Sequence, residues 1–90
     1  MTTFHSTRST TDSLTSKQAI RQGIAADGGL FVTDALGETR VDVAQLVGKS
    51  YQDIAVTVLG ALLPDFSEAE LRECVEAAYG PQWGDGAITP

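Results

Sequence analysis

The sequence predicts a small α+β domain, with short β-strands in its N-terminal half and three to four helices, the last two of which form an antiparallel pair. Three features indicate this fold. The N-terminal segment alternates polar and apolar residues, the capping-box pattern occurs twice, and residues 51–62 repeat apolar side chains at helical spacing. Ninety residues with 42% hydrophobic side chains can enclose one small core, so a single domain is expected.

The chain is expected to open with a strand and a loop. Residues 3–6 alternate moderately, which is typical of a short strand. The run from Ser9 to Ser13 is polar throughout and predicts a loop.

A first helix is expected over residues 17–22. Thr15 and Gln18 fit a capping box, in which each side chain satisfies a free amide at the helix start. Gly23 is placed to end the helix, because glycine adopts the C-cap conformation without steric cost. The residues expected on its inner side are Ala19, Ile20 and Ile24.

A tight turn at Asp27, Gly28 and Gly29 follows, since glycine enters positive φ easily and aspartate favours turns. Leu30 to Val32 would leave this turn as a strand. The segment from Asp34 to Arg40 is expected to be a loop, and Val43 to Val47 a short helix.

Two longer helices complete the predicted fold. The first ends before Pro64, because proline disfavours the helical conformation of its predecessor. Ser67 and Glu70 form a second capping box and begin the last helix. The inner positions of the first are Tyr51, Ile54, Ala55, Val58, Leu59 and Leu62. Those of the second are Leu71, Cys74, Val75, Ala78 and Tyr79. After this domain of residues 1–80, the composition of residues 81–90 is typical of a connector.

The charge balance excludes several kinds of partner. Six basic and twelve acidic residues give a formal net charge of −6, which repels phosphate backbones and anionic membranes. Neither a nucleic acid nor a membrane is therefore expected as a partner. Cys74 is the only cysteine, so the chain has no internal disulfide, and a reducing cytoplasm is the simplest location.

Arg8, with the neighbouring hydroxyls of Ser6 and Thr7, is the best candidate for substrate binding. A guanidinium matches the geometry of phosphate or carboxylate in a bidentate pair. The alternative is that Arg8 forms a structural bridge to a carboxylate such as Asp27, and this alternative is favoured. The turn at Asp27, Gly28 and Gly29 is likewise read as structural, with a ligand-binding backbone nest as its alternative, because a strand and not a helix follows it.

No catalytic, cofactor-binding or metal-binding residue is predicted in the chain. His5 lacks a partner at a diagnostic spacing, and Lys17 and Lys49 lie among polar residues that would not activate a Schiff-base lysine. Cys74 lies in an apolar repeat and is expected to be buried and inert. The last helix also carries four glutamates that point to solvent and do not indicate a metal site: Glu68, Glu70, Glu73 and Glu76.

The order and spacing of several short motifs resemble the N-terminal part of threonine synthases over about eighty residues. The motifs are Phe4-x-Ser-Thr-Arg8, the run Gly23 to Val32 containing Asp-Gly-Gly-Leu-Phe-Val, the segment Ser50 to Ala55, the helix Leu71 to Tyr79, and Ile88-Thr-Pro90. Thr33 departs from the pattern, since the family usually has proline there, and residues 34–46 are less recognisable.

This resemblance implies that the chain is the N-terminal domain of a fold-type II enzyme. Such an enzyme converts O-phospho-L-homoserine and water to L-threonine and phosphate, with pyridoxal phosphate as electron sink. The family's lysine and its cofactor-binding elements map after Pro90, so the chain alone is expected to be inactive and to bind no cofactor. Its partner would be its own downstream catalytic domain, toward which residues 81–90 lead.

Two other interpretations remain open. The chain could be a freestanding helical interaction module that presents Val56 and Leu63 as outer apolar residues. It could also be the N-terminal domain of a threonine-synthase-like phospholyase, which eliminates phosphate without making threonine. The sequence of the ninety residues does not separate this last possibility from a threonine synthase.

Overall fold

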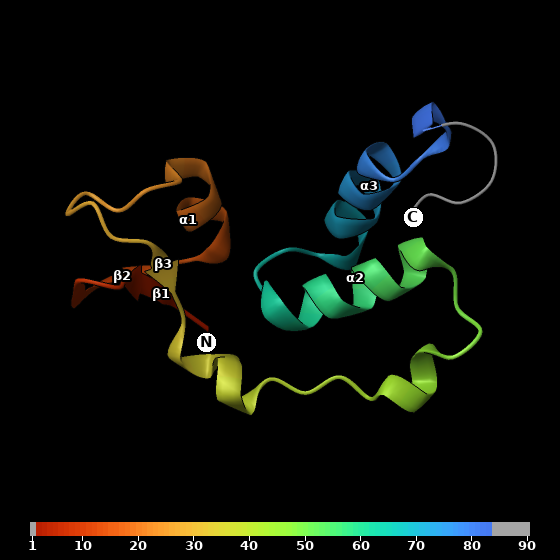
Figure 1. The fold of residues 1–90 in the computed structure, drawn as a ribbon, viewed down its shortest axis with the longest axis horizontal. Helices are drawn as coiled ribbons and strands as arrows, with labels where there is room; N and C mark the ends of the chain where they lie inside the picture. Colours follow the sequence, from red (N-terminus) through yellow and green to blue (C-terminus); the bar gives the residue numbers. More distant parts are fainter. Residues whose placement is uncertain (1, 84–90) are drawn as a thin grey trace.

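The computed structural model describes residues 2–83 and has two groups of elements (Figure 1). A sheet with one helix forms the first group, a pair of helices forms the second, and an extended segment with two short 3₁₀ helices connects them. In chain order the elements are β1 (Phe4–Ser6), β2 (Ser9–Leu14), α1 (Ser16–Gln22), β3 (Phe31–Val32), η1 (Asp34–Glu38), η2 (Val43–Leu46), α2 (Tyr51–Leu62), α3 (Glu68–Ala78) and η3 (Pro81–Trp83). The predicted α+β class is confirmed.

The sheet has three antiparallel strands in the order β2-β1-β3. In its register, Ser6 lies opposite Ser9 of β2 and Phe31 of β3, so β1 is the central strand. The prediction of a loop from Ser9 to Ser13 was wrong, because this polar run forms most of β2. Four of its six residues are Ser or Thr, so this edge strand has no apolar face and no alternation of polar and apolar residues. Its backbone can still pair with β1.

Helix α1 begins and ends as the sequence predicts. The Thr15–Gln18 capping box is present, and Gly23 ends the helix with φ of 81°. Of the three predicted inner residues, Ala19 is buried, but Ile20 and Ile24 are 60% and 61% exposed. Their prediction was wrong because a helix of seven residues buries one narrow stripe, which here consists of Ser16 and Ala19.

A carboxylate from the second group of elements binds the start of α1. Asp65, in the loop between α2 and α3, accepts hydrogen bonds at 3.0 Å from the backbone amides of both Ser16 and Lys17, and one from the Ser16 hydroxyl. The Lys17 side chain also pairs with Glu70 of α3 at 2.9 Å. Partial burial alone would raise the pKa of Asp65, but the hydrogen bonds from Ser16 and Lys17 outweigh this effect and keep the pKa below its usual value.

The larger apolar cluster lies between α2 and α3. Val56, Leu71 and Val75 are its buried residues, and partly buried residues pack around them: Ala55, Leu59, Phe66 and Tyr79. The predicted pairing of the two helices is thus confirmed, although Figure 1 shows them crossing obliquely and not strictly antiparallel.

Two predictions of helix faces were wrong. Val56 was expected on the outer side of α2, but it is 6% exposed and lies in the core, while Leu63 is half-buried. Cys74 was expected to be buried, but it is exposed, as is Ala78. Both errors arise because the two helices pack through the side of α2 that carries Val56 and the side of α3 that carries Val75. Which side is used depends on the partner helix and not on the sequence of either helix alone.

Residues 81–83 cap the C-terminal end of α3. The Ser67–Glu70 capping box begins this helix as predicted. At its other end, the side chains of Gln82 and Trp83 donate hydrogen bonds to the carbonyl oxygens of Ala77 and Ala78 at 2.5 and 2.6 Å. The rest of the predicted connector, residues 84–90, lies outside the described residues.

We expect Asp65→Ala to lower the free energy of unfolding by about 1–3 kcal/mol, because two backbone amides and a buried hydroxyl lose a charged acceptor. Chemical denaturation at neutral pH measures this loss. Asp12→Ala, which removes an exposed carboxylate on β2, is the matched control and should leave the stability unchanged.

At acidic pH, the difference in the free energy of unfolding between the wild-type chain and Asp65→Ala should become smaller. A carboxylate whose pKa is lowered in the folded state stabilises it above the pKa of the unfolded state, about 4, and this contribution is lost as the pH falls through the folded-state pKa. A difference that stays constant from neutral pH to strongly acidic pH would show that the Asp65 charge does not stabilise α1.

Candidate functional site

The candidate residues Ser6, Thr7 and Arg8 lie at the end of the central strand, against the turn that precedes β3. Two hydrogen bonds join Thr7 to Leu30. The Thr7 amide donates to the Leu30 carbonyl oxygen at 2.8 Å, and the Leu30 amide donates to Thr7 Oγ1 at 3.1 Å. The pairing of β1 with β3 therefore continues into the loop and brings two segments together that are about twenty residues apart in the sequence.

Ser6 is 1% exposed, and its hydroxyl is fully used inside the protein. It donates to Asp27 Oδ1 at 2.6 Å and accepts from the Arg8 amide at 3.1 Å. The same Asp27 oxygen accepts from the Gly29 amide at 3.0 Å. The bond from Ser6, followed by that from Gly29, lowers the pKa of Asp27 below its usual value, so this carboxylate is charged at neutral pH.

The side chain of Arg8 contacts the backbone of the turn. Its Nη1 donates to the carbonyl oxygen of Asp27 at 3.0 Å, and no ion pair joins its guanidinium to the Asp27 carboxylate among the described residues. The rest of the side chain is exposed. The contact thus orients the guanidinium beside Gly28, and the fork of N–H donors that could hold an oxyanion is not occupied by a carboxylate of residues 2–83.

The two glycines of the turn are needed for different reasons. Gly28 has φ of 83°, and its amide donates to the Ala25 carbonyl oxygen at 2.9 Å, which closes the turn. Gly29 has no positive φ, but a Cβ there would overlap the Ser6 hydroxyl and lie 2.9 Å from Thr7 Oγ1. The first glycine is therefore required by backbone conformation and the second by space.

His5 contacts Asp34, a pairing that no sequence feature predicts. Its Nδ1 lies 2.8 Å from the Ser6 carbonyl oxygen and its Nε2 lies 3.2 Å from Asp34 Oδ1. Both partners are acceptors, so the doubly protonated ring satisfies both contacts. The Ser6 carbonyl, and after it Asp34, raises the pKa of His5. The sequence separation of 29 residues leaves no local signal for this pair.

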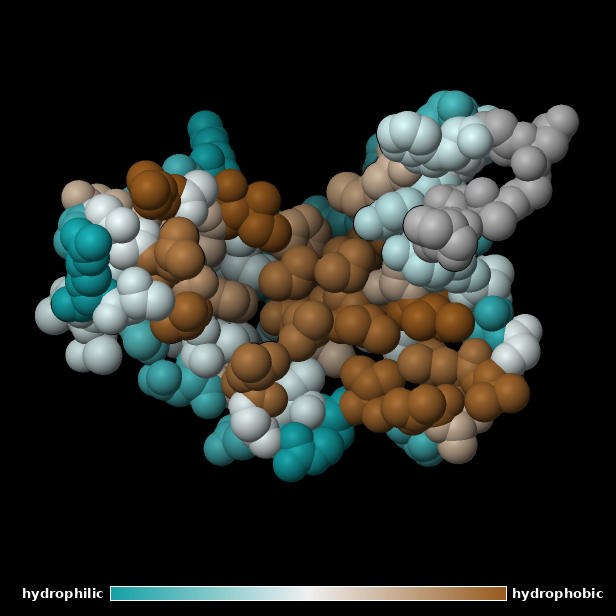
Figure 2. All heavy atoms as spheres, in the orientation of Figure 1, coloured by the Kyte–Doolittle hydropathy of each residue, from teal (hydrophilic) through white to brown (hydrophobic). Residues whose placement is uncertain are grey.

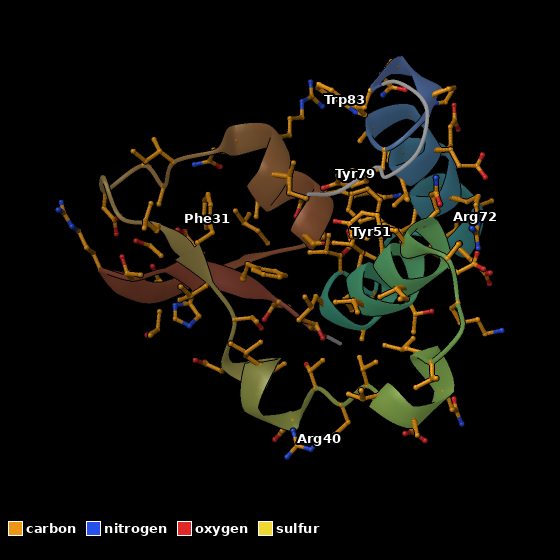
Figure 3. All side chains as sticks on the ribbon, turned by 45° about the vertical axis from the view of Figure 1, so that its right-hand side comes forward. Phe31, Arg40, Tyr51, Arg72, Tyr79 and Trp83 are labelled. Atoms are coloured by element: carbon orange, nitrogen blue, oxygen red, sulfur yellow. The ribbon has the colours of Figure 1, made fainter. Side chains whose placement is uncertain are left out.

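A groove of about 720 Å³ lies between the connecting segment and the helix pair, away from Arg8. Figure 3 shows Arg40 on the connecting segment and Arg72 on α3, which both line it. Arg72 pairs with Asp53 of α2 at 2.7 Å, and this contact lowers the pKa of Asp53. Because its charged residues include both signs, the groove does not form an anion site by charge alone. Its apolar lining includes Val41, Leu46, Ala61 and Phe66.

No group of three or more His, Cys, Asp or Glu side chains within residues 2–83 could hold a metal ion. None of the helices in that range is both long and apolar enough to cross a bilayer.

Comparisons with known proteins identify a family to which the chain is similar. A family model described as the threonine synthase N terminus matches residues 3–79. The threonine synthase of Methylobacillus glycogenes is 31% identical over 77 residues, and that of Eremothecium gossypii is 32% identical over 81 residues. Each match covers 84% of this chain but only 16% of the relative, so the chain spans about a sixth of the length of these curated relatives. No solved structure matches the chain.

We expect Gly29→Ala to destabilise the domain by about 1–3 kcal/mol, since the new methyl group must displace the buried Ser6 hydroxyl from Asp27. Thermal or chemical denaturation measures the change. Gly37→Ala is the matched control, because nothing lies within 4 Å of its added Cβ and its φ is not positive. Equal stability of the two variants would mean that Gly29 is not required by space.

Proposed function

The chain belongs to the threonine synthase N-terminal family, and from this membership we propose that it is the N-terminal domain of a threonine synthase. The observation that carries the proposal is the match of residues 3–79 to that family. Residues 1–80 would form the domain, and residues 81–90 would lead toward a catalytic domain. The greater length of the two relatives supports a longer parent protein.

The proposed parent enzyme is a fold-type II lyase of the cytoplasm that converts O-phospho-L-homoserine and water to L-threonine and phosphate. Pyridoxal phosphate would supply the electron sink for this reaction. The residues of this chain do not fit that cofactor. Lys17 is paired with Glu70 and lies 5.2 Å from the centre of the Phe66 ring, and Lys49, the only other lysine, is exposed. Neither has the desolvated, uncharged surroundings of a Schiff-base lysine.

Within this proposal, Arg8 is the residue to which we assign contact with the substrate phosphate. Its guanidinium is exposed and oriented by the Asp27 carbonyl, so a phosphate could bind without breaking an existing ion pair. Ser6 and Thr7 support this assignment indirectly. Their hydroxyls bind Asp27 and the Leu30 amide, and they hold the backbone from which Arg8 projects.

A phospholyase with the same N-terminal domain is the second candidate, because the matched region does not include the residues that decide between the two reactions. A freestanding interaction module is weaker, since Val56, one of the two residues expected to form its surface, is buried.

The proposed function is tested on the full-length protein encoded by the gene. Purified protein is incubated with O-phospho-L-homoserine, and both phosphate and L-threonine are measured. Equal amounts of the two products support a threonine synthase. Phosphate without threonine indicates the phospholyase, and a stop codon soon after residue 90 would contradict the proposal altogether. The 90-residue chain alone should release no phosphate.

If Arg8 binds the substrate phosphate, both Arg8→Ala and Arg8→Lys should raise the KM of the full-length enzyme roughly tenfold, the effect of losing about 1.4 kcal/mol of charged hydrogen bonding. The melting temperature of the 90-residue chain should hardly change, because Arg8 makes one exposed bond. Arg21→Ala, on the exposed surface of α1, is the matched control. A lower melting temperature with an unchanged KM would assign Arg8 a structural role.

A further inference from the structure

Helix α2 is apolar on most sides, yet Val56 is its only fully buried residue. No charged residue occurs between Ile54 and Leu63. A helix of this composition is normally enclosed. Of the apolar residues in this stretch, Ala55, Val56 and Leu59 lie in the cluster formed with α3. The other large apolar side chains of this stretch remain half-buried: Ile54, Val58, Leu62 and Leu63.

The connecting segment beside α2 adds two more apolar residues. Val43 and Val47 are 72% and 80% exposed, the highest values of any large apolar side chain among the described residues. The segment bends around η2, where the Asp42 side chain accepts a hydrogen bond from the Ala44 amide. Figure 2 shows apolar atoms gathered over α2 and over the segment below it. The groove between them includes Leu46 and Ala61 in its lining, and charged residues of both signs also line it.

We propose that α2 together with residues 43–47, here named the α2 face, is the surface on which the catalytic part of a threonine synthase docks. This inference rests on the proposed function. Apolar composition and depletion of charge are typical of the centre of a permanent interface, which resembles a domain core cut in two. The partner surface must accordingly be apolar and uncharged where it meets α2.

The occupant is part of the same polypeptide and not a second copy of this domain. The relatives are about six times longer than the matched region, so a catalytic part would be covalently attached. Attachment raises the effective concentration of the partner to the millimolar range. Two copies of this chain, in contrast, would each carry a formal charge of −6 and repel one another.

A second group of exposed apolar residues provides an internal control. Ile20, Ile24 and Leu30 are 60%, 61% and 64% exposed, and they lie in the sheet half of the domain. Arg21 and Gln22 lie between the first two in the sequence, so these residues do not form an uncharged stretch as α2 does. They should stay exposed when the α2 face is covered.

Hydroxyl-radical labelling with mass spectrometry compares the side chains in the 90-residue chain and in the full-length protein. Labelling of Val43 and Val47 should fall roughly fivefold in the full-length protein, as expected when such exposed side chains become interface core, and labelling of Ile20 and Ile24 should change less than about twofold. Val47→Asp should lower the melting temperature of the full-length protein by several degrees but not that of the 90-residue chain. Ile24→Asp, the matched variant, should leave both unchanged.

Each of the other possible results contradicts one specific claim. Equal labelling of Val43 and Val47 in both proteins, in an enzyme that does make threonine, overturns the docking face and leaves the proposed function standing. Protection that instead rises with the concentration of the 90-residue chain means that a second copy covers the face. Protection in a longer protein that makes no threonine overturns the proposed function, and with it the identity of the docking partner.

Discussion

The carboxylate of Asp65 fixes the arrangement of the two halves of this domain. It reaches from the loop between α2 and α3 to the first two amides of α1, where an acceptor with negative charge is favoured by the free N–H groups and by the helix dipole. The apolar residues do not form one core that could do this instead. Ala19 and Ala25 are buried in the sheet half, whereas Val56, Leu71 and Val75 are buried between the helices. Polar contacts, and not a shared apolar core, therefore orient the two small apolar clusters relative to each other.

The two most recognisable motifs of the sequence contact each other in the structure. Residues 6–8 and 27–30 are joined by the Ser6–Asp27 hydrogen bond, by two bonds between Thr7 and Leu30, and by the bond from Arg8 to the Asp27 carbonyl. Close approach of the backbones requires Gly29, and the buried Ser6 hydroxyl requires the Asp27 acceptor. Structural needs thus account for the serine, the aspartate and both glycines. Arg8 is different, because one exposed bond to a carbonyl oxygen does not require a guanidinium.

Sequence reasoning succeeded where structure is set within a few residues. The two capping boxes, the end of α1 at Gly23 and the pairing of α2 with α3 follow from neighbours along the chain, and the structure confirms them. The features that could not be predicted depend on contacts with residues far away in the sequence. The strand β2 exists because β1 lies beside it, and the burial of Val56 and exposure of Cys74 depend on how one helix rests on another. The bonds of Asp65 to Ser16 span 49 residues, and no pattern in the sequence marks that pair.

Because the apolar clusters are small, a bound partner would strongly change the stability of this domain. Five hydrophobic side chains are buried within residues 2–83, and a domain of this size has a stability of about 5–10 kcal/mol. Covering about 200 Å² of further apolar surface contributes roughly 5 kcal/mol at 25 cal/mol per Å². The half-covered sides of α2 could therefore change the stability of the domain by an amount similar to its whole value. A partner that binds only the folded form would then hold the helix pair together by mass action, and the orientation that Asp65 gives to α1 would be stabilised with it.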